Sequence, residues 1–372
     1  MRNILAALVM LIVICPAAVF AQATAVKTWD FEADTAGWLT MDKQGQVNLS
    51  TEAAHVHGGN SSLHFSFTPR VGDGEIPGTL FVQSDATGAQ SWQFAIDSSS
   101  GGPLIALLRE QDESTYVYMI YVVENQWQVL DLPFADFRLE ESSKDENGKL
   151  DPEQVTGIGF IDPGQWFLQS MQTGGFPFFF AAPSRREIWL DDVKLMSEPE
   201  KRMAEAEGPN GAEAVMIEDC DAEPGYWMVL GGRNLKVRRD GDQAADGSSL
   251  RLDYELPAKT LMAAARQVRL GLLKGARSIA FSVRSGGDCK LVVSVEETGK
   301  SRYSTVVDVT AGNWQQLTVP LRDLKLDDDS KDLDPGLQPE KIHSVQFVDG
   351  SALFGEKETA NTLWLDEVIA VK

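Results

Sequence analysis

Two stretches of this chain decide its fold: NQWQVLDLPFADF (residues 125–137) and GNWQQLTVPLRDL (residues 312–324). Each contains a tryptophan, an alternating apolar run, a proline, and an aspartate three places after the proline. The two tryptophans, Trp127 and Trp314, lie 187 positions apart (314 − 127 = 187). A chain that repeats such a pattern once is predicted to contain a duplicated unit.

The same offset of 187 aligns much of the chain without a gap, and pairs Phe94 with Phe281 and Phe160 with Phe347. The closing stretches IWLDDVKL (188–195) and LWLDEVIAV (363–371) also correspond, with a small shift. Copies of about 170 residues are too long for a solenoid repeat, so we expect tandem globular domains. We place a first module at 24–197, an acidic linker poor in large apolar residues at 198–213, and a second module at 214–372.

Within each copy the apolar pattern has a period of two. The run SWQFAID (91–97) puts Trp92, Phe94 and Ile96 on one face, and Gln93 and Asp97 on the other. Such short alternating runs, separated by Gly, Asp, Asn and Pro, are typical of antiparallel sheets. The predicted fold class is therefore all-β, with two tandem antiparallel β-sandwich domains.

The matched aromatic residues are predicted to pack in the core of each sandwich, because buried aromatic rings contribute most by area. Two matched prolines, Pro133 and Pro320, are predicted to end their strands, since proline cannot donate to a central ladder. The predicted core aromatics are Trp127, Trp314, Phe160, Phe347, Trp189 and Trp364.

The first residues form a predicted secretory signal peptide, residues 1–23, with a single arginine, an apolar run from Ile4 to Phe20, and small residues after it. A permanent membrane anchor is the alternative, and Pro16 with the small residues argues against it. We therefore expect a secreted or periplasmic protein with no membrane span after cleavage.

Charge and cysteine content narrow the function classes. The chain has 33 basic and 55 acidic residues, a net charge of −22, which excludes a nucleic-acid backbone as the natural partner. Outside the signal peptide only Cys220 and Cys289 remain, and both a disulfide and two buried free thiols are open interpretations. The sequence has no CxxC motif or Cys/His cluster that would indicate a zinc site.

The motifs quoted above, with the opening WDFEADTAGW (29–38), resemble those of galactose-binding-like jelly-roll domains. Family-11-type carbohydrate-binding modules share the pattern most fully, and the complex I intermediate-associated protein family shares much of it. The second copy departs from it at Leu321, Leu324 and Glu367. The resemblance implies a jelly roll and a carbohydrate ligand.

Acidic residues interrupt the first and last strands of each copy. In proteins of the resembling fold such residues often hold a structural calcium, so the resemblance implies Glu32 with Asp191, and Glu218 with Asp366, as Ca²⁺ ligands. Solvated strand-end carboxylates are the alternative. The acidic loops 144–153 and 326–336 lack the EF-hand register and are interpreted as solvated loops.

A sugar site needs ring or apolar surface for stacking and polar groups for hydroxyls. Comparison of the two copies predicts that Gln93, Asp97, Arg109 and Tyr121 lie together on the outer, non-core face of the first module. These residues are candidate ligand contacts, although simple solvent exposure would explain each one.

The segment from Ile161 to Trp189 is twelve residues longer than its counterpart. It contains a cluster of aromatic side chains that loops usually avoid: Trp166, Phe176, Phe178, Phe179 and Phe180. It is predicted to cover the ligand face, to pack against the second module, to contact another protein, or to tuck into its own core. Trp166 and Phe178 complete the candidate ligand residues.

The leading hypothesis is a secreted, non-catalytic binding protein that binds a polysaccharide or another glycan through its first module. The alternative is a protein-interaction or assembly scaffold that uses the Phe-rich loop 174–182. We predict no enzyme, because the sequence shows no recognisable triad, catalytic metal motif or phosphate-binding glycine loop, and paired carboxylates are easily found among 55 acidic residues.

Overall fold

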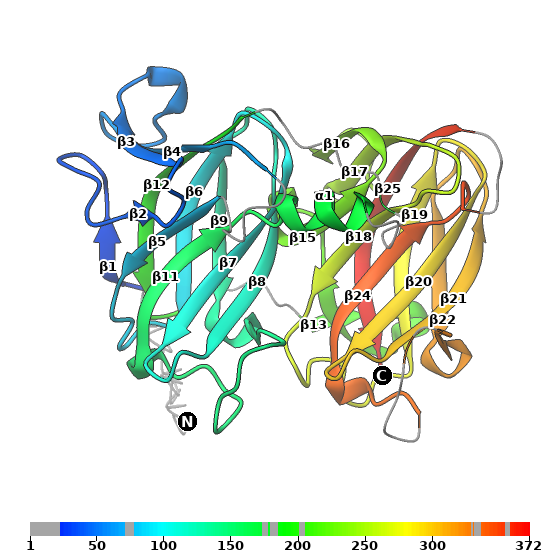
Figure 1. The fold of residues 1–372 in the computed structure, drawn as a ribbon. Helices are drawn as coiled ribbons and strands as arrows, with labels where there is room; N and C mark the ends of the chain where they lie inside the picture. The colour runs from blue at the N-terminus through cyan, green and yellow to red at the C-terminus, as the bar shows by residue number, and fades with distance from the viewer. Residues whose placement is uncertain are drawn as a thin grey trace, which may run out of the picture.

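The computed structural model describes residues 23–70, 78–172, 178, 185–200, 205–328, 330, 336–353 and 358–372. These residues form two antiparallel β-sandwiches in tandem, which confirms the predicted fold class (Figure 1). The predicted signal peptide lies outside the described residues apart from Ala23. Within the described ranges, no helix has the length and apolar character needed to cross a bilayer.

The first module consists of two sheets, which we name sheet A and sheet B. Sheet A contains β3 (Gln46–Ser50), β4 (Ser62–Phe67), β12 (Arg186–Met196), β6 (Ser91–Ser98) and β9 (Gln128–Pro133), in that order, with β1 (Ala25–Trp29) beside β12. Sheet B contains β10 (Arg138–Leu139), β8 (Thr115–Val122), β7 (Gly102–Glu110), β11 (Val155–Ile161), β5 (Thr79–Gln83) and β2 (Leu39–Thr40).

The second module repeats this arrangement in sheets that we name A′ and B′. Sheet A′ contains β13 (Glu205–Glu207), β14 (Glu213–Glu218), β25 (Thr359–Val371), β17 (Ser249–Leu256) and β16 (Arg233–Asp240), with β19 (Ser278–Ser285) between β25 and β22 (Gln315–Pro320). Sheet B′ contains β15 (Trp227–Gly231), β18 (Met262–Gln267), β24 (Ile342–Asp349), β20 (Cys289–Glu297), β21 (Arg302–Val309) and β23 (Lys325–Leu326).

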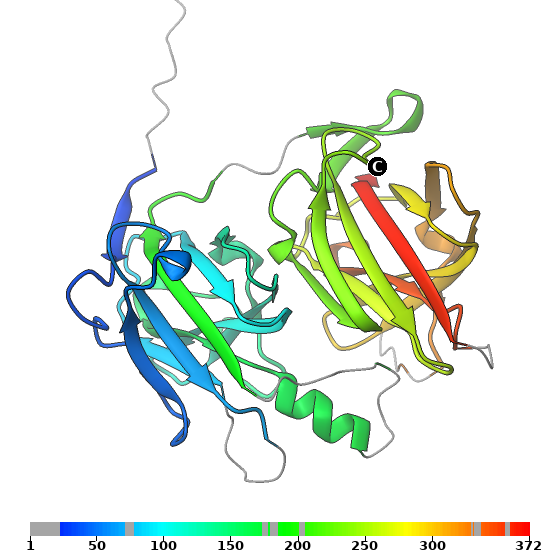
Figure 2. The same cartoon turned by 90° about the horizontal axis from the view of Figure 1, so that it is seen from above.

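Short helical segments connect the strands. The α-helix α1 (Gly164–Gln172) belongs to the insertion of the first module and lies between the two modules in Figures 1 and 2. The 3-10 turns are η1 (Ala53–His55), η2 (Phe134–Asp136), η3 (Pro152–Gln154), η4 (Pro209–Gly211), η5 (Pro224–Tyr226), η6 (Leu321–Asp323) and η7 (Pro339–Lys341).

Each sandwich has its own core, filled by the alternate residues that the sequence pattern places inward. Trp92, Phe94 and Phe160 form one fully buried cluster, with the Trp92 and Phe160 rings 4.7 Å apart. Phe281 and Phe347 do the same in the second module, also at 4.7 Å. The predicted core positions of SWQFAID and of both matched phenylalanines are confirmed.

The core prediction is wrong for four tryptophans. Trp127 and Trp314 are half-buried and lie just before β9 and β22, in connections rather than in strands. Trp189 and Trp364 are buried, but their strands point them away from the core, because their neighbours Ile188 and Leu190, or Leu363 and Leu365, point inward. A period-two pattern shows alternation but does not show what covers the outer face.

The described residues also bear on three further predictions: the strand-ending prolines, the linker and the cysteines. The strands β9 and β22 end at Pro133 and Pro320, as predicted. The segment 198–213 is not a pure linker, because β13 within it pairs with β14 and extends sheet A′. Cys220 and Cys289 are both buried free thiols, so the disulfide interpretation fails.

The two modules exchange side chains where they meet. Tyr226, from η5 of the second module, packs in the core of the first, and its hydroxyl oxygen accepts the amide N–H of Asp131 at 2.8 Å. In return, Tyr121 and Val123 of the first module pack in the core of the second. Each core is therefore completed by the other module.

A polar network surrounds this exchange. Arg266 of β18 donates to Glu218 at 2.7 Å and to the Tyr118 hydroxyl, while its guanidinium lies over the Tyr226 ring. Arg269 donates to Asp136 across the junction at 2.9 Å. Arg266 and Glu218 are buried and paired, as buried ions require, whereas Arg269 is partly exposed.

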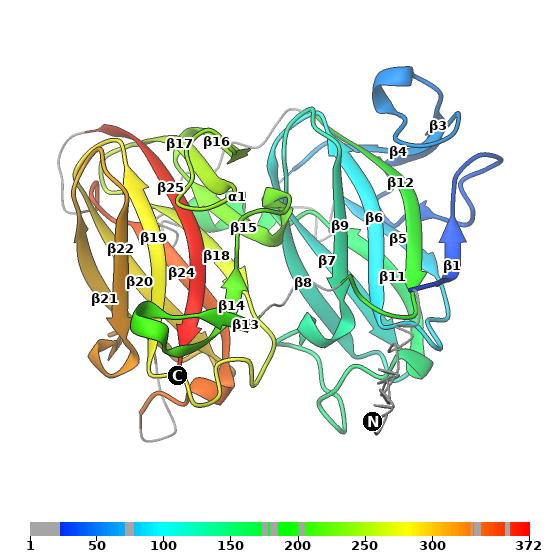
Figure 3. The same ribbon diagram turned by 180° about the vertical axis from the view of Figure 1, so that it is seen from behind.

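The junction sets the orientation of the modules. Sheets B and B′ face the viewer in Figure 1, and sheets A and A′ face the viewer when the molecule is turned in Figure 3. The outer faces of A and A′ therefore open on the same side of the molecule.

The exchange predicts the effect of shortening Tyr226. We expect Tyr226→Ala to destabilise the protein by about 3–5 kcal/mol, the range for large-to-small changes in a packed core. Because the first core then loses the side chain that the second module supplies to it, urea unfolding followed by tryptophan fluorescence and circular dichroism should separate into two transitions. Tyr226→Phe is the control and should cost only about 0.5–1.5 kcal/mol. Equal, single transitions for wild type and Tyr226→Ala would contradict this account.

Candidate functional site

The outer face of sheet A carries a row of side chains on four neighbouring strands. Asn48 of β3 lies opposite His64 of β4, His64 opposite Trp189 of β12, and Trp189 opposite Asp97 of β6. Opposed residues on one face of a sheet lie within contact distance. The row therefore places an aromatic ring between an imidazole and a carboxylate.

Imidazole rings stack on the tryptophan of this row. His55, from η1, lies parallel to Trp189 with ring centroids 3.6 Å apart and an interplanar angle of 3°. His64 stacks at 5.2 Å and 11°. Trp189 is therefore only 6% exposed, while the side chains of His55 and His64 remain 22% and 21% exposed.

A second pair of rings continues the surface. His57 lies 5.4 Å from Trp127, ring to ring, and its Nδ1 is 3.0 Å from the Asp192 carboxylate. The indole N–H of Trp127 has no hydrogen-bond acceptor among the described residues. We name these five side chains, with Asp97, the ring face: His55, His57, His64, Trp127, Trp189 and Asp97.

Charged groups surround the ring face and hold the imidazoles. His55 Nδ1 lies 3.2 Å from Asp97, and His64 Nε2 lies 3.5 Å from Glu187. Arg185 contacts the same Glu187 at 3.4 Å and is 53% exposed. Planar rings at the centre and exposed donors and acceptors at the rim form a surface that can stack on a sugar ring and bond its hydroxyls.

Asp191 fixes the loop that carries these histidines. Its buried Oδ2 accepts the amide N–H of His57 at 3.0 Å and of Gly58 at 2.9 Å. Glu32 holds the next part of the same loop, accepting from the amides of Asn60 at 2.8 Å and Ser61 at 3.2 Å. The two predicted calcium ligands thus serve backbone amides, and the calcium hypothesis stays a prediction.

The second module repeats this anchor with one correction to the predicted residues. Asp366 accepts the amides of Ala245 and Asp246 at 2.8 and 3.1 Å, as Asp191 does in the first module. Glu218, however, is not the counterpart of Glu32. It lies opposite Val368, where the first module has Trp29 opposite Val193, and it binds Arg266 at the junction.

Asp221 takes the place of Glu32 in the second module. Its carboxylate lies against Gly247 of the anchored loop, as that of Glu32 lies against Gly59. The preceding residues, Cys220 and Phe31, both have a left-handed φ, 59° and 53°. The sequence alignment matched Glu218 with Glu32 incorrectly, because the opening segments of the two copies differ in length. The similarity between these segments is too weak to show that difference.

Burial and charge shift the pKa values of these groups in different directions. Burial lowers the pKa of His64, and the Arg185 and His55 charges add to that effect against the opposing pull of Glu187. Burial raises the pKa of Asp191 despite its amide donors, and raises that of Asp366 to about 6. For Asp192, burial acts to raise the pKa, but the interactions with His57 and Lys194 together outweigh it, so the pKa is lowered.

The structure does not bring the six predicted ligand residues together. Gln93 and Asp97 lie on the outer face of sheet A, four residues or roughly 13 Å apart along β6. Arg109 and Tyr121 lie on the outer face of sheet B, on the other side of the sandwich. Arg109 is 46% exposed, but Tyr121 is buried in the junction, so only Asp97 belongs to the ring face.

The insertion lies on the sheet B side. Trp166 of α1 is 40% exposed. Phe178 forms an isolated bridge with Leu261, and its ring lies so close to Gly231 that an added Cβ would be 3.0 Å away. At this position the insertion packs against the second module. The rest of the predicted contact loop 174–182 lies outside the described residues.

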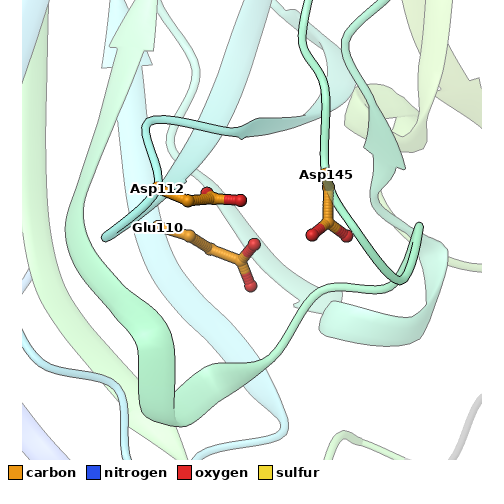
Figure 4. A group of neighbouring side chains, drawn as sticks. All are labelled: Glu110, Asp112 and Asp145. Atoms are coloured by element: carbon orange, nitrogen blue, oxygen red, sulfur yellow. The ribbon is translucent and has the colours of Figure 1, made fainter.

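A further acidic group lies at one end of the first sandwich, formed by Glu110, Asp112 and Asp145 (Figure 4). In the described part of the chain, it is the one group of three such residues whose ligand atoms lie within 4.8 Å of one another. Its oxygens already accept hydrogen bonds, from Ser114 to Glu110 at 2.7 Å and from Tyr116 to Asp145 at 2.6 Å. Burial raises the pKa of Glu110.

The fold is a tandem pair of antiparallel β-sandwich modules of the jelly-roll kind. No family model matches the chain, and no curated protein matches it by sequence. Among solved structures it is similar to a family 11 carbohydrate-binding module of a cellulosomal cellulase of Clostridium thermocellum, at 12% identity, covering 42% of this chain and 94% of that chain, with a TM-score of 0.35.

The chain is also similar to two other solved structures. A tandem pair of family 22 modules from Paenibacillus barcinonensis shares 13% identity and covers 96% of this chain and 99% of that chain, with a TM-score of 0.30. A family 30 module of another Clostridium thermocellum cellulase shares 18% identity, with 37% and 87% covered and a TM-score of 0.28. The predicted resemblance to such modules is confirmed, but at these values it does not identify a ligand.

The loop anchors predict a matched pair of substitutions. Asp191→Asn should destabilise the first module by about 1–3 kcal/mol, because the new amide would point N–H groups at the donors of His57 and Gly58. Asp366→Asn should act alike in the second module. The free energy of unfolding in urea, measured for each variant and for the wild type, tests both predictions. A melting temperature that rises with calcium in the wild type, and no longer does in Asp191→Asn, would instead support the predicted metal site.

The lowered pKa of His64 predicts a pH dependence of stability. Unfolded-state histidine, with its ordinary pKa of 6.5, takes up a proton before the folded residue does. Stability should therefore fall as the pH drops through about 6.5 toward 5, because the unfolded state binds more protons there. Unfolding free energies of wild type and His64→Gln at several pH values measure this contribution, and an unchanged slope in the variant would contradict it.

Proposed function

We propose that this protein is a secreted, non-catalytic binding protein that binds a glycan on the ring face of its first module. The observation that carries the proposal is the ring face itself, in which Trp189 and Trp127 with three imidazoles are bordered by carboxylates and an arginine. Protein surfaces that bind sugars combine ring faces with charged donors and acceptors, and this face has both.

The ring face is preorganised for such a ligand. The loop bearing His55 and His57 is held by buried Asp191, and each imidazole has a carboxylate partner. A ligand that binds to rings already fixed in place pays little further side-chain entropy. The partial exposure of His55, His57 and His64 leaves polar edges open to hydroxyl groups.

The contacts of His55 do not have the geometry of an acyl-transfer triad. In the part of the chain that the structure describes, no hydroxyl or thiol is hydrogen-bonded to the His55 ring, which pairs with Asp97 alone. A nucleophile bonded to the base is the arrangement that acyl-transfer triads require.

The scaffold hypothesis rests on the Phe-rich insertion. The one described phenylalanine of the loop 174–182, Phe178, packs on Gly231 and Leu261 of the same chain. That contact favours a role for the insertion within the molecule, and glycan binding remains the better-supported proposal.

Affinity gel electrophoresis with neutral polysaccharides tests the proposal. β-1,3-1,4-Glucan, xylan, galactan and hydroxyethyl cellulose are the probes, used with residues 24–372. We expect at least one to retard the protein, and Trp127→Ala to weaken that binding roughly tenfold or more, about 1.4 kcal/mol. The matched Trp314→Ala should leave it unchanged.

Arg109→Ala, on the opposite sheet, is the second control and should bind like the wild type. Loss of binding in Arg109→Ala with full binding in Trp127→Ala would move the site to sheet B. Equal migration of the wild type with and without every polysaccharide would refute glycan binding for these ligands.

A further inference from the structure

The outer face of sheet A′ carries a row in the same register as the ring face, with different charges. Arg238 of β16 lies opposite Arg251 of β17, Arg251 opposite Trp364 of β25, and Trp364 opposite Arg284 of β19. The corresponding row of the first module reads Asn48, His64, Trp189 and Asp97. The duplicated chain has kept the tryptophan and replaced its neighbours by arginines.

Two of the arginines lie against the ring. The guanidinium carbons of Arg251 and Arg284 are each 5.0 Å from the centroid of Trp364. The indole N–H donates to Asp240 at 3.1 Å, which helps to fix the orientation of the ring. Arginine over a tryptophan face is favourable by about 0.5–2 kcal/mol, so the row is held in place before any ligand arrives.

The carboxylates near the row do not balance its charge. Asp253 accepts from Arg251 at 3.0–3.1 Å and lies 3.3 Å from Arg238, while Asp240 accepts from Arg251 at 3.1 Å. With Lys236, opposite Asp253 in the pairing of β16 and β17, the face carries four cations against three carboxylates. The third, Asp366, lies opposite Ser282 and accepts the amides of Ala245 and Asp246 rather than an arginine. This local excess of positive charge stands out in a chain of net charge −22.

Donor capacity is also left over. Arg238 is 50% exposed. Arg284 contacts Gln243, but its Nε is buried and has no acceptor among the described residues. Guanidinium groups match carboxylate and sulfate geometry through paired N–H donors, which lysine cannot reproduce.

We infer that the outer face of sheet A′ binds an acidic glycan, whose carboxylate or sulfate group is held by Arg238 and Arg284 beside Trp364. This inference rests on the proposed glycan binding and assigns a second, charge-selective site to the same chain. The two modules would then select different ligands by charge, because Asp97 of the first row would repel the anionic group that Arg284 attracts.

The test uses residues 24–372 with polygalacturonate and dextran sulfate as the carboxylate and sulfate probes, and dextran as the uncharged control. Isothermal titration at several salt concentrations should show binding of at least one anionic probe that weakens with salt, and none of dextran. Arg284→Asp, which installs the residue of the first module, should lower that affinity at least tenfold. Arg238→Ala, at an exposed position that folding does not need, should lower it at least threefold.

Lys290→Asp is the matched control, since it makes the same change of charge at an exposed position on sheet B′, 59% exposed. It should bind within twofold of the wild type. An equal loss in Lys290→Asp would show attraction by general charge and overturn the site, as would full affinity in both arginine variants.

The outcomes separate this inference from the proposed function. Binding of a neutral polysaccharide that Trp127→Ala weakens, with no binding of either anionic probe, refutes the acidic-glycan site and leaves the proposed function standing. Binding of an anionic probe alone, lost in Arg284→Asp, supports this site and refutes the ring face. No binding of any polysaccharide refutes both.

Discussion

The hydrogen bonds from backbone amides to Asp191, and their repetition at Asp366, are the constraint on which both faces depend. Each carboxylate stands on the closing strand of its module and holds the loop that precedes the second strand of the sheet. The residue after it has a left-handed φ, 48° at Asp192 and 47° at Glu367, so the strand bulges at this point in both copies. Because charged acceptors of amide N–H groups form the stronger class of hydrogen bond, the loop is fixed well enough to carry functional side chains.

What the anchored loop carries differs between the copies. In the first module it delivers His55 and His57 to a row whose only formal charge is the carboxylate of Asp97. In the second module it delivers Gln243, which contacts one of three arginines in the row. Duplication thus preserved the supports and the central tryptophan, and the residues beside them diverged.

The fold could be predicted from the sequence because it depends on repeated, local signals. The alternation in SWQFAID identifies core positions, and the prolines mark the ends of β9 and β22. These signals are local, and the offset of 187 shows that they recur in the second copy. Phe160 and Phe347 follow from the same alternation.

The site could be predicted only in part, because it depends on which sheet a strand joins. Alternation identifies the outer residues of a strand, but Asp97 and Arg109 are outer residues of opposite sheets. His55 and His57 come from a turn whose path is set by Asp191, 134 residues later in the chain for His57. The one available signal was that three of four histidines fall within ten residues, between His55 and His64.

The interlocked junction has a mechanical consequence. Tyr226 in one core and Tyr121 in the other leave no hinge between the sandwiches, and the outer faces of sheets A and A′ open on the same side (Figure 3). When a polymer is bound at one site, its attachment to the second site of the same rigid molecule costs little further entropy. Only a polymer whose repeat length and stiffness match the fixed distance between the two sites can occupy both and gain this avidity. The fixed distance between the modules, in addition to the chemistry of each face, would then determine which polymers bind tightly.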